Sequence, residues 1–304
     1  MKPSVVVVGS LNQDIVVQVE ELPREGETLM GIGMSESPGG KGANQGVAIG
    51  KLQACVSMIG KVGSDPHAAS LMKSLQQAGV DTRYIMTSNR PTGLAFVTVD
   101  RAGSNHIVVI PGANHELTPE DIDSQRQAIE KCEIVVLQLE IPLKTVEYTL
   151  RLAKELGKTT VLNPAPAQML RDEILRFVDF LIPNEHELQS MSGMTITDAS
   201  TLQAAARVYL SKGVRALIVT LGGKGCCYID HERVQTYPAR KVKAQDTTAA
   251  GDSFIGGFVA GYLKYHDVDL AIELAQKAAA ITVTRHGAQS SLPTWEEVAA
   301  FDIS

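Results

Sequence analysis

Cysteine is scarce in this chain, with four residues among 304. They are Cys55, Cys132, Cys226 and Cys227, and no pair has the C-x-x-C spacing of a redox motif. Two of the four are adjacent, so they do not fit a framework of disulfides. The seven histidines also lack the spacing of a zinc site. We therefore expect a reducing, cytoplasmic setting.

Long hydrophobic runs and an excess of positive charge are missing as well. The apolar run Val5 to Val8 is too short for the core of a signal peptide, and no run approaches the ~18 residues of a transmembrane helix. Lys and Arg number 28 against 34 Asp and Glu, which gives a formal net charge of -6. Without a basic patch, neither nucleic acid nor a membrane is an expected partner.

Three common site signatures are absent. The first predicted strand is followed by "GSLNQD" at residues 9–14, where a dinucleotide-binding fold needs G-x-G-x-x-G. The G-K-T at 157–159 lacks the glycine of a Walker loop five residues earlier, because Leu152 stands there. The G-x-S-x-G elbow of hydrolases does not occur. An anionic ligand would therefore have to be held by local backbone N–H groups and a few cations.

The sequence does contain a repeated alternation of strand and helix patterns. Strands are predicted at residues 5–8, 54–63, 133–140, 159–166, 178–185 and 215–223. Helices are predicted at residues 43–52, 64–80, 118–132 and 142–157, with two more between 253 and 285. This order predicts an α/β fold, in which a central, mostly parallel sheet is flanked by helices on both faces.

Four further strand patterns carry little helix signal, and they come from two separate segments. They cover residues 14–22, 26–37, 93–100 and 105–112, and the last two are joined by a short link containing Gly103 that predicts a hairpin. We expect a small four-stranded sheet made by residues 15–33 and 92–111. Residues 1–14, 34–91 and 112–304 are expected to form the α/β core.

Polar residues gather where the predicted core strands end. They are Asn12, Asp14, Glu140, Asn163, Asn184, Glu187, Thr220 and Gly222. Ligands of open α/β sheets bind outside the carboxyl ends of the strands. Any one of these residues could equally be an ordinary loop residue, but together they predict a site.

Two glycine-rich stretches stand out. In "DTTAAGDSF" at 246–254, small residues precede a helix whose first N–H groups could bind an anion. Asp252 in its first turn either caps the helix, which contributes ~1 kcal/mol, or removes a proton from an attacking hydroxyl. In "GGKGANQ" at 39–45, the glycines predict a turn that something approaches closely. Asn44 would face the ligand from the following helix.

These two stretches resemble the paired signatures of the ribokinase-like carbohydrate kinases, also called the PfkB family. The resemblance runs from residue 9 to "RHGAQSSLP" at 285–293. It implies transfer of the ATP γ-phosphate to the 5-hydroxyl of a sugar, with D-ribose as the first choice. The alternatives are 2-deoxyribose, another sugar, a nucleoside or, in a different class, a non-catalytic protein that senses a sugar or nucleotide.

The resemblance also implies residue roles. Asp252 would be the catalytic base, and the N–H groups of Ala249, Ala250 and Gly251 would form the anion hole. The implied sugar-binding residues are Asn12, Asp14, Gly40, Lys41, Asn44, Glu140 and Asp252. The implied nucleotide-binding residues are Asn184, Thr220, Gly222, Gly225 and Gln276. Gln276 departs from the Asn or His that often contacts the adenine in this family.

Metal ions and a lid follow from the same resemblance. Asn184 and Glu187 would position Mg²⁺, partly through water. A monovalent cation, usually K⁺, would be held mostly by backbone carbonyls at Asp246, Thr248, Thr282, Arg285, Gly287 and Ser291. The small sheet would be a lid that closes over the sugar and pairs with a second lid in a homodimer.

Overall fold

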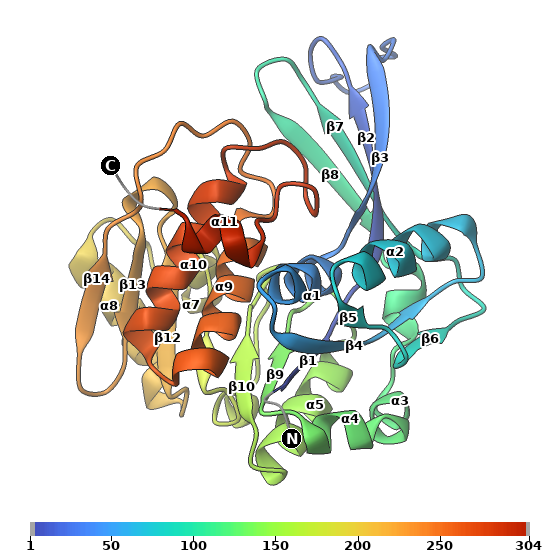
Figure 1. Ribbon diagram of the computed structural model, residues 1–304. Helices are drawn as coiled ribbons and strands as arrows, with labels where there is room; N and C mark the ends of the chain where they lie inside the picture. The colour runs from blue at the N-terminus through green and yellow to red at the C-terminus, as the bar shows by residue number, and fades with distance from the viewer. Residues whose placement is uncertain (1–3, 302–304) are drawn as a thin grey trace.

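The fold is built on one large sheet, seen in a computed structural model that describes residues 4–301 (Figure 1). This ten-stranded sheet has the order β14-β13-β12-β11-β10-β9-β1-β4-β5, with β6 beside β4. Its strands are β1 Ser4–Val8, β4 Cys55–Val62, β5 Val80–Asp81, β6 Ile85–Thr87, β9 Ile134–Leu137, β10 Thr159–Leu162, β11 Phe180–Leu181, β12 Ala216–Thr220, β13 Cys226–Ile229 and β14 Val234–Tyr237. The strands from β5 to β12 are parallel, and only β13 and β14 join antiparallel. The predicted mostly parallel sheet is confirmed.

Helices cover both faces of this sheet, as predicted. They are α1 Lys41–Lys51, α2 Pro66–Gln77, α3 Pro119–Ser124, α4 Arg126–Lys131, α5 Leu143–Glu155, α6 Asp172–Leu175, α7 Glu185–Ser192, α8 Ala199–Ser211, α9 Ala250–Tyr265, α10 Val268–Thr282 and α11 Trp295–Ala299, with short 3-10 turns η1 Gly112–Glu116 and η2 Gly222–Lys224. The predicted helix over 118–132 is broken in two, because Gln125 takes a non-helical conformation between α3 and α4.

The run of valines in β1 shows why a central strand is apolar throughout. Val5 and Val7 belong to the core cluster that includes residues of α1, α2, α9 and α10. Val6 and Val8 belong to the opposite cluster, which includes residues of α3, α4, α5 and α8. Side chains alternate between the faces of a strand, so a strand with helices on both sides needs apolar residues at every position.

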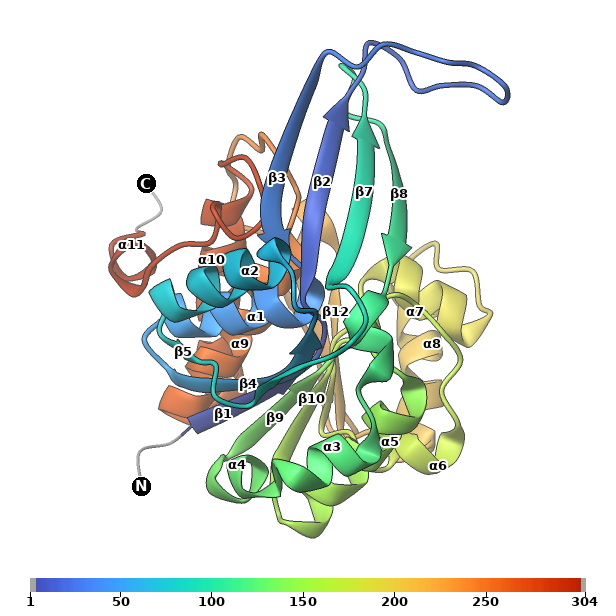
Figure 2. The same ribbon diagram turned by 90° about the vertical axis from the view of Figure 1, so that its right-hand side faces the viewer.

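A second sheet stands away from the first (Figure 2). It has four strands in the order β3-β2-β7-β8, which are β2 Asn12–Gln18, β3 Gly33–Gly39, β7 Gly93–Val99 and β8 Asn105–Ile110. Strands β2 and β7 run parallel from a shared base, where Asn12 pairs with Gly93. We call these four strands the lid sheet.

The boundaries of the lid sheet differ from prediction in both β2 and β3. Strand β2 begins at Asn12, inside residues 1–14 that were expected in the core, and it ends at Gln18. The strand expected over 26–37 begins only at Gly33, and it continues to Gly39, beyond the expected boundary at residue 33. The preceding segment is an exposed turn in which Gly26 has a φ of 79°. It has to reverse the chain between two antiparallel strands, so it cannot itself be a strand.

Candidate active site

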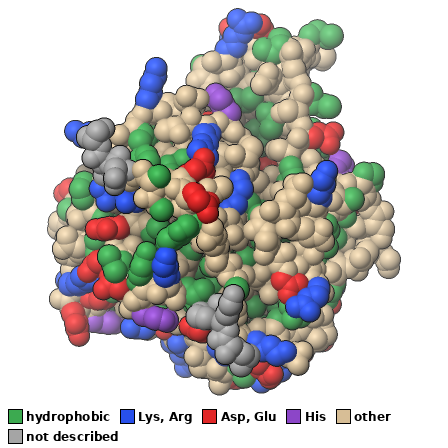
Figure 3. Space-filling view, viewed as in Figure 1, with side chains coloured by type: hydrophobic (Ala, Val, Ile, Leu, Met, Phe, Trp, Pro, Cys, Tyr) green, Lys and Arg blue, Asp and Glu red, His purple; other side chains and the backbone are tan. Residues whose placement is uncertain are grey.

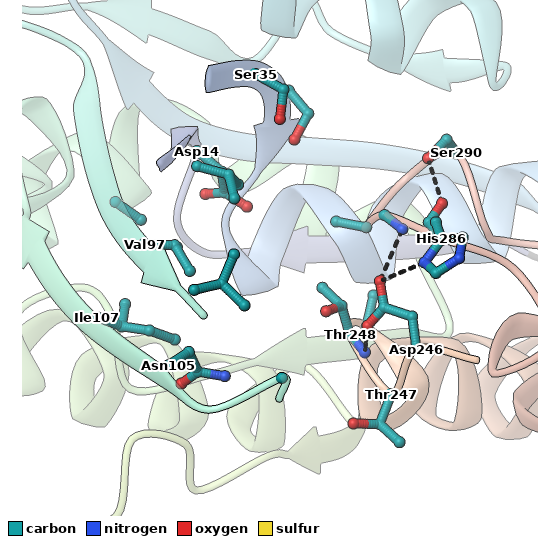
Figure 4. A pocket seen from close by; sticks show the side chains of 18 of the residues that line it. Asp14, Ser35, Val97, Asn105, Ile107, Asp246, Thr247, Thr248, His286 and Ser290 are labelled. Carbon is teal, nitrogen blue, oxygen red and sulfur yellow. Dashed lines mark hydrogen bonds and ion pairs between the residues drawn. The ribbon is translucent and has the colours of Figure 1, made fainter. Parts of the chain in front are cut away.

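The site is a cavity of about 1130 Å³ between the lid sheet and the large sheet. Lid residues such as Asp14, Val97 and Ile107 line one side, and Asp246 to Thr248 line the other (Figure 4). A second cavity of about 220 Å³ is lined by Asn163, Asn184, Glu187 and Thr220, among others. Four residues line both cavities: Lys41, Thr247, Ala249 and Asp252. The predicted sugar and nucleotide sides therefore meet at Asp252.

Asp252 does not cap its helix. The N-cap of α9 is Ala249, and no side chain accepts a hydrogen bond from the first turn. Instead, Asp252 Oδ2 accepts from Asn44 Nδ2 and Oδ1 accepts from Gln45 Nε2, both at 3.0 Å. The capping interpretation is wrong, because both carboxylate oxygens are held by side chains of α1.

The start of α9 supplies backbone donors beside this carboxylate. Ala249 has a φ of 57°, a left-handed conformation that turns the chain sharply into the helix. The Ala250 N–H already donates to the Thr247 carbonyl at 3.2 Å. Within residues 4–301, the N–H groups of Ala249 and Gly251 have no such acceptor. These two N–H groups are therefore the best placed of the predicted trio to meet an anion.

Glycines are required in "GGKG" because other parts of the backbone lie too close for a side chain. A Cβ on Gly40 would lie 2.6 Å from the Asn12 backbone nitrogen, and one on Gly42 would lie 2.6 Å from that of Ser10. Gly40 also has a φ of 86°. The turn thus lets the start of α1 pack directly onto the β1–β2 connection, which brings Lys41 and Asn44 to the cavity.

Burial and like charges set the protonation of the acidic residues. Burial, together with the nearby Glu140 and Asp252, raises the pKa of Asp14 to about 7, although Lys41 acts to lower it. Burial also raises the pKa of Asp252, against the effects of Lys41, Asn44 and Gln45. Burial lowers the pKa of Lys41, but Asp252 and Glu140 outweigh it, so the net pKa is raised and the ammonium stays charged.

Glu140 and Asn12 are held in place by neighbouring polar groups. Glu140 Oε2 accepts from Ser10 Oγ at 2.5 Å and from the Lys41 N–H at 3.1 Å, at the positive end of α1. Asn12 Oδ1 accepts from Asn114 Nδ2 at 2.7 Å. Asn114 also accepts from the Leu11 N–H at 2.8 Å, so it fixes the base of β2.

The smaller cavity presents hard oxygen atoms. Asn184 caps α7 and shares a capping box with Glu187, in which Asn184 Oδ1 accepts from the Glu187 N–H at 2.7 Å. Burial raises the pKa of Glu187. No group of three His, Cys, Asp or Glu side chains forms a metal cluster in residues 4–301. The residues fit Mg²⁺ held mainly through water and phosphate oxygens, which this ion tolerates.

Three predicted nucleotide-binding residues do not line either cavity. Gly222 begins the η2 turn after β12 and Gly225 directly follows it, with φ values of 56° and 104°. Gln276 lies buried on α10, where its Nε2 donates to the Tyr237 carbonyl at 2.9 Å. The amide nitrogen of Gln276 therefore holds the end of β14.

The predicted monovalent-cation residues come from two segments that Asp246 ties together. Its carboxylate accepts from the Thr248 N–H at 2.8 Å and from the Gly287 N–H at 2.9 Å. Burial acts to raise the pKa of Asp246, but the hydrogen bonds from Thr248 and Gly287 outweigh it and the pKa is lowered. The Arg285 guanidinium turns away to pair with Glu297 at 2.6 Å, and the hydroxyls of Thr282 and Ser291 donate to nearby backbone carbonyls.

Comparisons with known proteins agree on one family. The model of the pfkB family of carbohydrate kinases matches residues 2–295. The chain belongs to the PfkB family of carbohydrate kinases.

The PfkB relatives include enzymes named for two different sugars. A ribokinase of Staphylococcus aureus is 41% identical over 98% of this chain and 99% of its own length. A deoxyribokinase of Salmonella typhi is 39% identical over 96% of each chain. The solved structure of Arabidopsis thaliana ribokinase complexed with ribose and ATP has a TM-score of 0.93 at 31% identity, covering 99% of this chain and 100% of that one.

Sequence reasoning missed two polar residues of this PfkB site, Gln45 and Asn114, and had listed a third, Asn163. Gln45 donates to the carboxylate of Asp252, Asn163 lines the smaller cavity and Asn114 fixes Asn12. Asn163 was one of the strand-end residues that together predicted a site, and it does line a cavity. Gln45 stands inside the first glycine-rich signature, which was the available signal, whereas nothing local marks Asn114.

Proposed function

We propose that this PfkB kinase transfers the γ-phosphate of ATP to the 5-hydroxyl of D-ribose, giving ribose 5-phosphate and ADP. The observation that carries the proposal is the position of Asp252 where the two cavities meet. The larger cavity offers Asn12, Asp14 and Asn44 to a polyhydroxyl ligand. The smaller one offers Asn184 and Thr220 to a nucleotide.

Asp252 takes the proton of the sugar hydroxyl in this scheme. The hydroxyl oxygen then bonds to the γ-phosphorus while the bond to the β-phosphate oxygen breaks, and ADP leaves. Burial raises the pKa of Asp252, which strengthens it as a base, while Lys41 and the two amides favour its ionised form. The N–H groups of Ala249 and Gly251 would stabilise the charge that develops on the transferred group.

Two ions fit this chemistry. Mg²⁺ held near Asn184 and Glu187 would neutralise phosphate charge. A monovalent cation held by the carbonyls of the Asp246–Thr248 and Thr282–Ser291 segments would fix the loop that leads into α9. In this structure that loop is already tied by Asp246.

Asp14 favours ribose over 2-deoxyribose. Its two carboxylate oxygens can accept hydrogen bonds from two adjacent hydroxyls, and 2-deoxyribose lacks one of that pair. An unmet buried acceptor costs about 1–3 kcal/mol, which is enough for a clear preference. Because one of the relatives is named a deoxyribokinase, 2-deoxyribose is the alternative substrate.

The lid sheet would also form a homodimer interface. Its strand β8 is exposed along its whole length, and Ile107, Val108, Val109 and Ile110 are each 46–62% exposed. Green hydrophobic side chains mark the lid at the top right of Figure 3. An apolar, unpaired strand edge of this kind suits pairing with a second copy. Light scattering of the purified chain would show whether two copies associate.

ADP release by the purified protein tests the proposed reaction. The assay contains Mg-ATP and K⁺ with ribose, 2-deoxyribose, other pentoses, fructose or nucleosides, each in turn. Fast turnover confined to ribose supports the proposal. Turnover on another sugar contradicts only the choice of ribose as substrate and leaves the proposed reaction standing. Sugar binding without turnover on any of them would support the sensor alternative. Among residues 4–301, no helix is both long enough and apolar enough to cross a membrane.

A further inference from the structure

Asp252 lies in a set of buried carboxamides that the scheme above does not use. Asn44 and Gln45 are neighbours in the first turn of α1, and each donates to a different carboxylate oxygen of Asp252. Asn44 and Gln45 are 6% and 0% exposed. In this way one turn of helix holds both oxygens of the proposed base.

Each of these two amides is held in turn by a glutamine from elsewhere in the fold. Gln289 Nε2 donates to Asn44 Oδ1 at 3.1 Å, and Ser74 Oγ donates to Gln289 Oε1 at 2.6 Å. Gln138 Nε2 donates to Gln45 Oε1 at 2.6 Å. Gln138 and Gln289 are themselves buried.

The direction of these hydrogen bonds decides what Asp252 meets. A carboxamide presents either its NH₂ group or its oxygen to a neighbour. If Asn44 turned over, its oxygen would face the Asp252 carboxylate, a hydrogen bond would be lost and two acceptors would repel each other. The donor from Gln289 holds the Asn44 oxygen away from Asp252 and thereby prevents that arrangement.

Asn44 depends more on its partner than Gln45 does. Gln45 Nε2 also donates to Asn163 Oδ1 at 3.2 Å, so two acceptors and one donor fix its orientation. Asn44 has one acceptor, Asp252, and one donor, Gln289. Removing Gln289 therefore releases Asn44 more completely than removing Gln138 releases Gln45.

We propose that Gln289 is a positioning residue for phosphoryl transfer, acting on the base Asp252 through Asn44. The proposal rests on the proposed function of Asp252. Gln289 lies in the segment between α10 and α11, and its backbone carbonyl accepts from Lys51 Nζ at 3.0 Å, which anchors that segment to α1. The same segment contains Gly287, so Gln289 also connects the proposed cation loop to the base.

The charged groups around Asp252 make the orientation of Asn44 matter. Lys41 on α1 favours the ionised carboxylate, whereas Glu140 after β9 disfavours it. Asp14 on β2 and Glu187 on α7 also face Asp252 and disfavour its ionised form. With three carboxylates opposing one ammonium, the amide donors are needed to keep Asp252 ionised.

Two substitutions of Gln289 separate the effect of its hydrogen bond to Asn44 from the effect of its buried volume. Gln289→Glu keeps the length but replaces the donor with an acceptor, so Asn44 must turn its NH₂ group away from Asp252. We expect kcat at pH 7 to fall about 10–100-fold and the acidic limb of its pH profile to move up by about one unit. Gln289→Met removes the donor without adding charge, and we expect a loss of about three- to tenfold.

Gln77→Glu is the matched control, because Gln77 is exposed on α2, the helix that carries Ser74. It should keep the kcat and the pH profile of the parent protein. The proposal is overturned if both Gln289 variants keep the parent kcat, or if kcat falls with no shift of the pH profile. If Gln289→Glu does not melt cooperatively, Gln289→Met decides the question by its kcat and pH profile.

A readout without catalysis keeps this test separate from the proposed function. The side-chain NH₂ signals of Asn44, measured by ¹H–¹⁵N NMR, should move as Asp252 titrates in the parent protein and in Gln77→Glu. In Gln289→Glu they should start from different positions and lose that dependence on pH. If the parent protein phosphorylates no sugar, the proposed function fails, and the same signals still show whether Gln289 orients Asn44. Unchanged signals in Gln289→Glu would overturn the inference.

Discussion

Asn44 Nδ2 donates to Asp252 Oδ2 at 3.0 Å, across 208 positions of sequence. Together with the bond from Gln45 Nε2 to Asp252 Oδ1, this hydrogen bond joins the two glycine-rich signatures, one at the start of α1 and the other at the start of α9. Helices α1 and α9 pack against each other in the core cluster that contains Val47 and Phe258. The fold thus brings two helix starts together at one carboxylate.

Replacing Gly39 tests the sugar side of the cavity. A Cβ on Gly39 would lie 2.1 Å from Asp14 Oδ2, so Gly39→Ala must displace that carboxylate. Losing a charge-assisted hydrogen bond of about 1.5–3 kcal/mol should raise the ribose KM by roughly 10–100-fold, with a smaller effect on kcat. Steady-state kinetics at varied ribose concentration would measure both.

Gly46→Ala on α1 is the control for Gly39→Ala. A Cβ there meets its nearest neighbours at 3.9 Å, which is ordinary contact. Its kinetic constants should stay close to those of the parent protein. An unchanged ribose KM in Gly39→Ala would remove Asp14 from the account of sugar binding.

The raised pKa of Asp14 predicts a pH-dependent cost in stability. Because its folded pKa is about 7 and its ordinary value is 3.8, the folded state retains a proton that the unfolded state has lost between those values. Protonated Asp14 makes its full contribution to the free energy of unfolding below the ordinary pKa of 3.8, and this contribution is lost as the pH rises through the folded pKa of about 7. Asp14→Asn cannot ionise, so its stability relative to the parent should rise by about 2–4 kcal/mol between pH 5 and pH 8.

Denaturant unfolding of the ligand-free protein at several pH values would measure this difference. The same Asp14→Asn variant should bind ribose more weakly, because its amide can accept through only one oxygen. A stability difference that stays constant from pH 5 to pH 8 would contradict the burial argument for Asp14.

Asn114 should affect both stability and sugar binding. Asn114→Ala leaves the Leu11 N–H and carbonyl without their side-chain partners and frees Asn12. We expect about 1–3 kcal/mol of lost stability together with a raised ribose KM. His115→Ala is the control, because His115 is exposed on the same η1 turn. If Asn114→Ala binds ribose normally, Asn114 only stabilises the fold.

The fold was largely predictable because its signals are local. The valines of β1 and the glycine-containing hairpin between β7 and β8 were both visible in short stretches. The two glycine-rich signatures indicated the ligand side of the sheet. Where the local signal was mixed, at Gln125 and before Gly33, the predicted element was broken or displaced.

The relations within the site could not be predicted in the same way. The role of Gln45 depends on which end of its amide faces Asp252, and Gln138 sets that from 93 positions away. Asp252 looked like a helix cap because an acidic residue in a first turn usually is one. Only the packing of α1 against α9 shows that its oxygens have other partners.

The most direct test of the central claim compares Asp252→Asn with the parent protein. Because Asn cannot accept the hydroxyl proton, ADP release with ribose and Mg-ATP should fall by about 10²–10⁴-fold. Ribose binding, measured by calorimetry, should persist, since Asn keeps the size of the side chain. Loss of turnover with retained binding is the result that the account predicts. Near-parental ADP release in Asp252→Asn would contradict it.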